Sequence, residues 1–179
     1  MTEAIVTDLD AVRLLATAHQ DAFDVMRYML QLDDDLSDEA IDNLVERIAE
    51  PVIKAIDCTQ CGNCCRSLHV YLTESDAVRL AEALGKSTDA IVDTYIDQES
   101  AQAEGEWGRF AQRPCALLKG NLCSIYAHRP NTCRAYPQFT PDFRWLLPDI
   151  IEGASLCPII YNVLVRLLPL VDEGIEKHI

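Results

Sequence analysis

The first third of the chain repeats apolar residues at steps of three and four, which is the periodicity of an amphipathic helix. The first such run extends from Asp8 to about Leu32, and the acidic triplet that follows should end it. Ser37 predicts the N-cap of a second helix, because its hydroxyl can accept a hydrogen bond from the first helical turn. Proline lacks the amide hydrogen that a helix interior needs, so Pro51 should end or kink this helix. Residues 1–57 are therefore expected to form a helical hairpin.

Shorter elements occupy the middle of the chain. Residues 68–72 match a short strand, and Thr73 with Asp76 forms the capping-box pattern of a helix that should end at Gly85. The other expected elements, in chain order, are a helix over 88–96, a polar loop over 97–106, a strand over 107–110, a hairpin over 115–126, a helical turn after Arg129-Pro130, and a buried helix that starts at Cys157-Pro158 and breaks near Pro169. The pattern assigns no element to residues 138–156.

These elements predict a mainly helical α+β fold. We expect a small cysteine-rich core with a short β-hairpin, flanked by an N-terminal helical hairpin and a C-terminal helix. The expected division is an acidic hairpin over 1–57 and a cysteine-cluster domain with the C-terminal helix over 58–179, packed as one compact unit. The length of 179 residues and the apolar fraction of 49% are sufficient for a hydrophobic core.

Charge narrows the choice of partners. The net charge is −14, of which residues 1–57 carry −10 and residues 58–179 carry −4. Such a field repels phosphates, which argues against a nucleic-acid partner. The acidic N-terminal face is either a solvated surface or a surface that meets a basic protein partner. The sequence does not determine the oligomeric state.

Composition also bears on the compartment. The chain has no apolar run long enough to span a bilayer, and its first residues lack the basic and apolar regions of a secretory signal. We therefore expect no membrane partner and a cytoplasmic location, where disulfides are uncommon. Eight cysteines in such a protein indicate metal ligands or reactive thiols before they indicate disulfides.

The strongest chemical signal is the segment Cys58-Thr-Gln-Cys-Gly-Asn-Cys-Cys65, which places four sulfurs within eight residues. Gly62 and Asn63 tolerate the left-handed backbone angles of a turn, so successive cysteines can face one point. Zinc and iron bind several thiolates at once. We predict all eight cysteines as metal ligands: Cys58, Cys61, Cys64, Cys65, Cys115, Cys123, Cys133 and Cys157.

Adjacent cysteines leave two alternatives: one binds a metal while the other is structural, or the two serve separate sites, which eight thiols divided by four favour. Neighbouring side chains point apart in a strand and diverge by roughly 100° in a helix, so Cys64 and Cys65 are not expected to share one tetrahedral metal. One division assigns Cys58, Cys61, Cys64 and Cys157 to the first site, and Cys65, Cys115, Cys123 and Cys133 to the second. The first set, with its distant Cys-Pro, has a spacing like that of bacterial ferredoxins. A buried structural thiol is the alternative role for Cys157.

Three arginines and three histidines accompany the cysteines. Arg66, Arg129 and Arg134 either donate N–H groups to the sulfurs and offset their negative charge, or pair with carboxylates of this acidic protein. His19 is expected to be a core or edge residue of the first helix. His69 and His128 are further nitrogen donors, and a role other than metal ligand is expected for each.

Residues 55–160 resemble the YkgJ-type CxxCxxCC cysteine-cluster family. The resemblance rests on the cysteine segment at 58–65, on Cys115-Ala-Leu-Leu with Cys123-Ser-Ile-Tyr, and on Arg129-Pro-x2-Cys-Arg-x-Tyr-Pro137. The family is described as a zinc- or iron-chelating domain, and some members are called iron–sulfur-cluster proteins. The resemblance implies that these cysteines chelate a metal. Flagellin lysine methylases share a related cluster, which keeps an enzymatic interpretation open.

Three functions fit the sequence. The first is chelation of zinc or iron without catalysis, because a zinc saturated with four sulfurs has no open position for substrate. The second is an iron–sulfur protein that transfers electrons or assists a methyltransferase-type enzyme. The third is a thiol redox or metal-sensing module. We identify no catalytic residues, and no glycine-rich nucleotide-binding loop that would indicate an autonomous methyltransferase.

Overall fold

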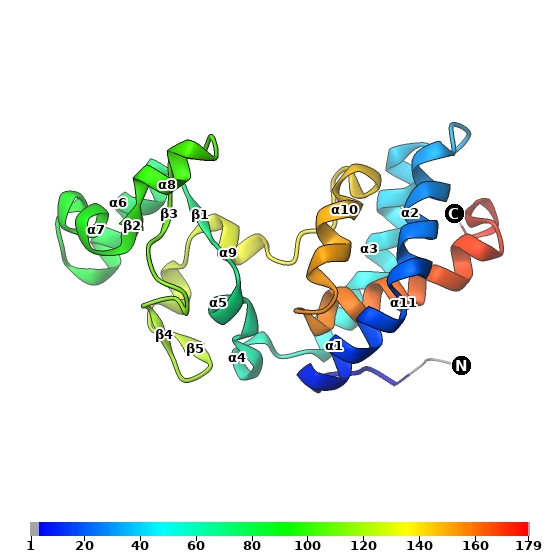
Figure 1. Ribbon diagram of the computed structural model, residues 1–179, viewed down its shortest axis with the longest axis horizontal. Helices are drawn as coiled ribbons and strands as arrows, with labels where there is room; N and C mark the ends of the chain where they lie inside the picture. The colour runs from blue at the N-terminus through cyan, green and yellow to red at the C-terminus, as the bar shows by residue number, and fades with distance from the viewer. Residues whose placement is uncertain (1–3, 179) are drawn as a thin grey trace. The chain divides into compact units, whose positions relative to one another are not determined.

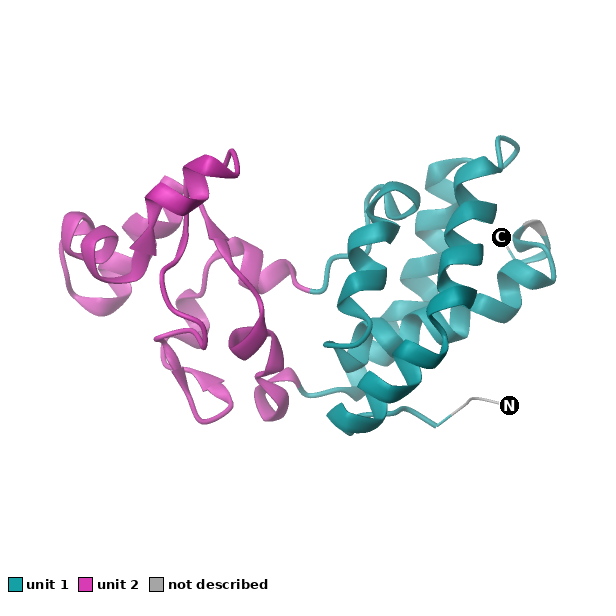
Figure 2. Ribbon diagram, in the orientation of Figure 1, with its two compact units in different colours: residues 1–57, 137–179 teal, residues 58–136 magenta. Residues whose placement is uncertain are grey.

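The computed structural model describes residues 4–178. It divides into two compact units (Figure 2). Unit 1 comprises residues 1–57 and 137–179, and unit 2 comprises residues 58–136. Helices dominate both units and the strands are short and antiparallel, so the predicted mainly helical α+β class is confirmed. In the described residues no helix is both long and apolar enough to cross a membrane.

Unit 1 is helical. Its elements are α1 (Leu9–Ala18), α2 (Gln20–Leu32), α3 (Asp38–Ala55), α10 (Phe143–Gly153), α11 (Pro158–Asp172) and the 3-10 turn η2 (Ile175–Lys177) (Figure 1). The single helix predicted from Asp8 to Leu32 is wrong, because the helix breaks at His19. The imidazole of His19 lies 2.8 Å from the carbonyl oxygen of Leu15, and its ring stacks on Phe23. His19 is thus the core-edge residue that the sequence predicted.

Prolines do not end the helices that contain them. Pro51 lies inside α3 and Pro169 lies inside α11, so neither helix ends at its proline and the break predicted near Pro169 is wrong. An internal proline costs about 3 kcal/mol through its lost hydrogen bond and its ring clash. Beyond each proline the helix still buries apolar residues, Val52 at 1% exposure and Val171 at 5%. Burying such a side chain contributes about 1.5–3 kcal/mol, which offsets that cost.

A distant carboxylate starts the helix that the sequence left unassigned. The amides of Asp142 and Phe143 both donate to the carboxylate of Asp42 on α3, each at 2.9 Å. These amides are among the unpaired donors at the start of α10. A capping group from another helix cannot be seen in local sequence, which explains the missing prediction over 143–153.

The core of unit 1 is built around α11. This helix buries most of its length and packs against α2, α3 and α10. The sequence grouped the last helix with the cysteine-bearing segment, whereas in the structure it packs with the N-terminal helices. The Asn162 amide group also holds the N-terminal segment, because it accepts from the Val6 amide at 3.0 Å and donates to the Val6 carbonyl at 2.7 Å.

Unit 2 combines short helices with two small sheets. Its elements are α4 (Cys58–Cys61), α5 (Asn63–Ser67), β1 (Tyr71–Leu72), α6 (Glu74–Leu84), α7 (Thr88–Tyr95), β2 (Ile96–Asp97), α8 (Gln98–Ala103), β3 (Gly108–Phe110), β4 (Leu118–Lys119), β5 (Leu122–Cys123), η1 (Tyr126–His128) and α9 (Asn131–Ala135). The strand order is β1-β3-β2 in one sheet, and β4 pairs with β5 in the other. The polar loop predicted over 97–106 instead contains α8, whose start is capped by the Asp97 side chain.

A compact apolar core supports the cysteines of unit 2. It contains Leu72, Ala77, Leu80, Ala81, Ile91, Ile96, Phe110, Leu117 and Ile125. Cys115, Cys123 and Cys133 are partly buried and pack against it. The core therefore brings together three chain segments that each carry one cysteine.

Candidate metal centre

The cysteine segment forms two short helices joined by Gly62. This residue has φ 61° and ψ 13°, in the left-handed region that the sequence predicted for the turn. A Cβ atom there would lie 2.8 Å from the backbone oxygen of Asn121, so glycine is required by space as well as by angle. Cys58 on α4 is exposed, whereas Cys61 on α4 and both cysteines of α5 are partly buried.

Arg66 and Asn121 tie these helices to the β4–β5 turn. The Arg66 guanidinium donates to the carbonyl oxygens of Cys61 at 2.8 Å and Gly120 at 2.9 Å, and also to the Asn121 side chain. The Asn121 amide group donates to the Gln60 carbonyl at 2.7 Å. These bonds hold the cysteine segment against the hairpin that carries Cys123.

The backbone brings two more cysteines toward Cys65. The amide of Cys115 donates to the Cys65 carbonyl at 2.9 Å, so the two residues lie side by side. The Cys115 carbonyl then accepts from the Leu118 amide at 3.0 Å, and Leu118 pairs with Cys123 across β4 and β5. Cys115 thus precedes the hairpin and does not lie in a strand, but the hairpin still returns Cys123 toward it.

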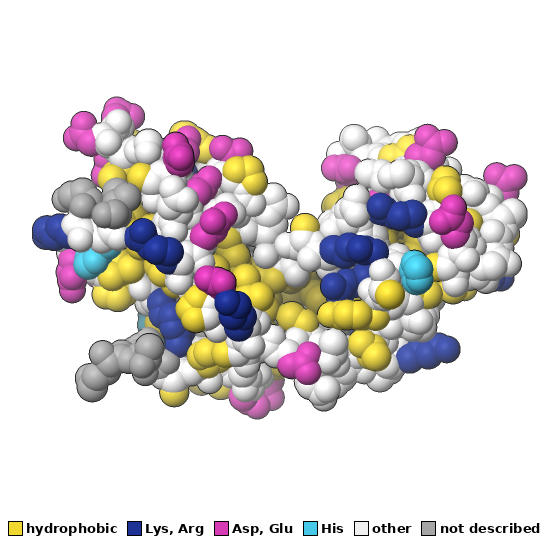
Figure 3. All heavy atoms as spheres, turned by 180° about the vertical axis from the view of Figure 1, so that it is seen from behind, with side chains coloured by type: hydrophobic (Ala, Val, Ile, Leu, Met, Phe, Trp, Pro, Cys, Tyr) yellow, Lys and Arg dark blue, Asp and Glu magenta, His cyan; other side chains and the backbone are white. Residues whose placement is uncertain are grey.

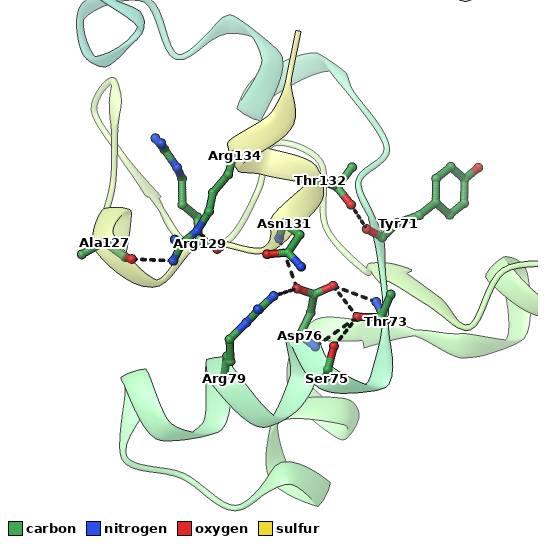
Figure 4. Close-up of polar contacts among 10 residues, drawn as sticks. All are labelled: Tyr71, Thr73, Ser75, Asp76, Arg79, Ala127, Arg129, Asn131, Thr132 and Arg134. Carbon is green, nitrogen blue, oxygen red and sulfur yellow. Dashed lines mark hydrogen bonds and ion pairs between the residues drawn. The ribbon is translucent and has the colours of Figure 1, made fainter. Parts of the chain in front are cut away.

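Asp76 positions the chain segment that carries Cys133. Its carboxylate is 1% exposed and accepts from the Thr73 amide at 2.9 Å, the Thr73 hydroxyl at 2.7 Å and the Asn131 amide at 3.2 Å, and it pairs with Arg79 (Figure 4). Burial raises the pKa of Asp76, but these hydrogen bonds outweigh that effect, so its pKa lies below the ordinary value. Asn131 begins α9, the helix of Cys133. Asp76 therefore links the start of α6 to the start of the Cys133 helix.

Cys65 acts electrostatically on three other thiols of unit 2. The hydrogen bond with Cys64 lowers the pKa of Cys65 to about 6, against the effect of burial and with help from the charges of Arg66 and Arg129. Burial raises the pKa of the other three members, that of Cys133 to about 12, and the charge on Cys65 raises each of them further. The four are Cys65, Cys115, Cys123 and Cys133, the set that the sequence assigned to the second site.

The neighbouring cysteines of α5 lie closer than their sequence position indicated. The sulfur atoms of Cys64 and Cys65 are 4.0 Å apart. Two sulfurs on one tetrahedral zinc are about 3.8 Å apart, as follows from a Zn–S bond of about 2.3 Å. The premise that adjacent cysteines point too far apart to share a metal is therefore not met, and the division into two sites rests on the number and spacing of the cysteines alone.

Arg129 is a positive charge placed among the thiols. Its guanidinium lies 3.7 Å from the centre of the Tyr126 ring, and its charge lowers the pKa of Cys65, Cys123 and Cys133. Among the described residues its Nε atom is buried without a hydrogen-bond partner. A buried, unused donor beside thiols fits a thiolate–metal centre, which carries excess negative charge and accepts such hydrogen bonds.

The guanidinium groups of Arg66 and Arg134 donate to backbone carbonyl oxygens. The Arg134 guanidinium donates to the Ala127 carbonyl at 2.7 Å and the Arg129 carbonyl at 2.9 Å, which fixes the turn before Cys133. Within the part of the chain that the structure describes, Arg66, Arg129 and Arg134 form no ion pair with a carboxylate. The alternative that they serve to balance surface carboxylates is therefore not what the structure shows.

One predicted ligand, Cys157, lies outside unit 2. Cys157 lies in unit 1, where it precedes α11 and is 8% exposed. Over residues 4–178 no group of three or more His, Cys, Asp or Glu side chains is already arranged to hold a metal ion. Metal binding would thus require the sulfurs to draw closer together. Sequence reasoning identified Asp76 as a cap but missed its bond to Asn131, for which the sequence offers no signal.

Cysteines on neighbouring segments of unit 2, with the Arg129 charge acting on them, are the features of a cysteine-cluster protein. Residues 57–150 match the family model CxxCxxCC, described as "Putative zinc- or iron-chelating domain". The match covers more than half of the chain, and the protein belongs to this family. No curated protein and no solved structure matches the chain.

Proposed function

We propose that this protein binds zinc or iron through cysteine thiolates and does so without catalysing a reaction at that centre. The observation that supports the proposal is the backbone bonding that brings Cys115 beside Cys65, at 2.9 Å between amide and carbonyl, and returns Cys123 toward Cys115 through the β4–β5 pair. The charge on Cys65 also raises the pKa of Cys115, Cys123 and Cys133. As thiolates, neighbouring cysteines repel one another, because ionising one makes it harder to ionise the next, and a bound cation removes that repulsion.

The donor set favours a soft or borderline metal. Four thiolates around zinc make a closed site, which stabilises a fold and leaves no coordination position for substrate. Cys65, with a pKa of about 6, is mostly ionised at neutral pH and can bind the ion first. The charge of Arg129 offsets part of the negative charge that builds up as further thiols lose their protons.

Cys58, Cys61, Cys64 and Cys157 form the second part of the proposal. The spacing of the first three suits a common metal, and Cys157 stays a predicted metal ligand on the basis of the sequence alone. The competing role for Cys157 is a buried apolar thiol in the core of unit 1. Under the two-site proposal the protein binds two ions per chain, and Cys157→Ser lowers that number. If Cys157→Ser keeps its full metal content, Cys157 is a buried structural thiol and not a metal ligand.

Metal analysis of protein purified without oxygen tests the proposal directly. We expect zinc or iron at one to two equivalents per chain, and a colourless sample if the metal is zinc. Cys123→Ser should lower the metal content and the thermal stability together, because metal binding is coupled to folding. The matched control is Ser124→Ala, which changes the next side chain and should leave both quantities unchanged. Metal-free protein with all eight thiols reactive would overturn the proposal.

The same purification separates the iron–sulfur alternative, which rests on the Cys58-x2-Cys61-x2-Cys64 spacing. A brown protein that contains inorganic sulfide in proportion to iron would show an iron–sulfur cluster in place of a simply chelated ion, and electron transfer would then be the favoured function. The ligand variants then distinguish the two cysteine sets, because loss of colour in Cys61→Ser and its retention in Cys123→Ser would place the cluster on the first set.

A further inference from the structure

Helix α2 has a second apolar face in addition to the one that packs into unit 1. Phe23, Met26 and Leu30 are buried in the core of the unit. The residues at positions i, i+3, i+4 and i+7 of the opposite side are also apolar, yet they are exposed. These residues, which we call the α2 stripe, are Val25 at 56%, Tyr28 at 57%, Met29 at 45% and Leu32 at 77% exposure.

The spacing makes the α2 stripe continuous. Residues at these four positions share one side of a helix over two turns, a length of about 10 Å. Single exposed apolar residues are ordinary on protein surfaces, whereas a contiguous exposed row indicates a binding surface. The stripe has the same anchor spacing that helices use when they pack on a partner helix.

The charge around the α2 stripe selects the partner. Unit 1 contains 20 acidic and 7 basic residues, and unit 2 contains 9 and 8, so unit 1 carries −13 of the total −14. The face of the molecule in Figure 3 carries side chains of both charges, so the charge next to the stripe is taken from the residues that flank it in the sequence. Asp21 and Asp24 lie toward the N-terminal end of the stripe, and Asp33, Asp34 and Asp35 follow its C-terminal end.

Two basic side chains meet this stretch, and both are already engaged. Arg144 of α10 donates to the Asp33 carbonyl at 2.8 Å and pairs with Asp38 at 2.9 Å. Arg27 lies 4.6 Å from the centre of the Tyr28 ring and 3.7 Å from the Asp24 carboxylate. A second copy of this chain would bring another −13 against the same surface, and an anionic lipid surface would be repelled in the same way. An apolar row between carboxylates complements a helix with apolar anchors and flanking Lys or Arg.

We propose that the α2 stripe is the docking surface for a basic amphipathic helix of another protein. Its apolar anchors lie along Val25, Tyr28, Met29 and Leu32, and its cationic side chains face the aspartates at both ends of α2. This inference does not depend on metal binding, because every residue that carries it lies in unit 1.

Fluorescence anisotropy with designed peptides tests the proposal. The probe is a labelled 18-residue helix with leucines at i, i+3, i+4 and i+7 and lysines elsewhere, and its partner probe has glutamate at every lysine. We expect the lysine peptide to bind the full-length protein at least tenfold more tightly than the glutamate peptide, a difference of about 1.4 kcal/mol. We also expect its binding to weaken with added salt, which screens the aspartates.

Variants decide whether the stripe itself is the binding surface. Val25→Ser with Leu32→Ser should weaken binding of the lysine peptide at least tenfold. The matched control is Leu14→Ser with Val78→Ser, which alters the same residue types at exposed positions on α1 and α6 and should change binding less than twofold. All four positions are exposed, so we expect every variant to fold, with unchanged circular dichroism and metal content.

Several outcomes would overturn the inference. Equal losses in the stripe and control variants would mean non-specific attraction to an acidic surface. Equal binding of the glutamate peptide would remove the charge argument. A dimer in light scattering that Val25→Ser with Leu32→Ser converts to monomer would make a second copy the occupant, and stripe-dependent binding to phosphatidylserine vesicles would make it a membrane.

Discussion

The link through Asp76 gives the sharpest test of how unit 2 is held together. Its carboxylate serves four donors, and each hydrogen bond to a charged group contributes about 1.5–3 kcal/mol, although the contributions are not additive. Asp76→Asn keeps the shape, removes the charge and turns an NH2 group toward one of the donors. Removing one partner of a buried ion pair costs about 3–5 kcal/mol.

The expected loss for Asp76→Asn is smaller than that limit. The Arg79 side chain is 37% exposed, so water solvates it again when the charge is lost. We therefore expect a loss of about 2–4 kcal/mol in the free energy of unfolding at pH 7. Asp89→Asn is the matched control, since it makes the same change at an exposed position in the first turn of α7 and should cost under about 1 kcal/mol.

The unfolding of unit 2 in urea can be followed separately by tryptophan fluorescence. The chain has two tryptophans, Trp107 in unit 2 and Trp145 in unit 1, so a Trp145→Phe background makes the fluorescence report Trp107. Trp107 packs against the core of unit 2. If Asp76→Asn lowers the free energy of unfolding by less than about 1 kcal/mol at pH 7, the reasoning is refuted, because a satisfied buried carboxylate cannot be removed so cheaply.

The pH dependence adds a second check on Asp76. The folded-state pKa of this carboxyl is lowered, so its stabilisation is fully present above the unfolded pKa of about 4 and is lost as the pH falls through the folded value. The difference between the wild type and Asp76→Asn should therefore shrink from pH 7 to pH 3. A difference that grows on acidification would contradict the lowered pKa.

Three further predictions concern the cysteine-bearing unit. Gly62→Ala should destabilise unit 2 by about 1–2 kcal/mol more than Gly85→Ala in urea denaturation, because both glycines have positive φ but only a Cβ at 62 meets backbone; equal losses would contradict the close approach. Zinc binding at pH 7 to the set that includes Cys65, measured by calorimetry in two buffers in a Cys61→Ser background, should release about three protons and not four, because Cys65 is already ionised while its three partners are not. Arg129→Gln should lower zinc affinity about tenfold in a chelator competition, and Arg129→Lys should restore most of it because the charge returns; an unchanged affinity in Arg129→Gln would show that this charge does not support the thiolates.

Local sequence determined the ends of several elements. Ser37 caps α3 and Thr73 with Asp76 forms the predicted capping box of α6, which ends at Gly85 with φ 63°. Each of these signals acts within four residues, so it does not depend on the rest of the chain. The cysteine segment is equally local, since its spacing and Gly62 lie within eight residues.

Interactions between distant residues decided the rest. The stacking of His19 on Phe23 accompanies the break between α1 and α2, and Asp42 supplies the cap of α10 from a hundred residues away. Internal prolines stayed helical because burial on the far side outweighs one lost hydrogen bond. None of these energies can be read from a window of neighbouring residues.

The candidate site divides in the same way. The sequence supplied the cysteines and proposed that Cys65 joins Cys115, Cys123 and Cys133. This grouping stays a prediction, and the effect of Cys65 on the pKa of the other three thiols supports it. Tertiary structure decided how the helix of Cys133 is held, because the Asp76 carboxylate accepts from the amide of Asn131, 55 positions away in the chain. Sequence could name the residues able to bind a metal, since that is a property of sulfur. Which of them meet depends on the long-range packing that closes the loops between them.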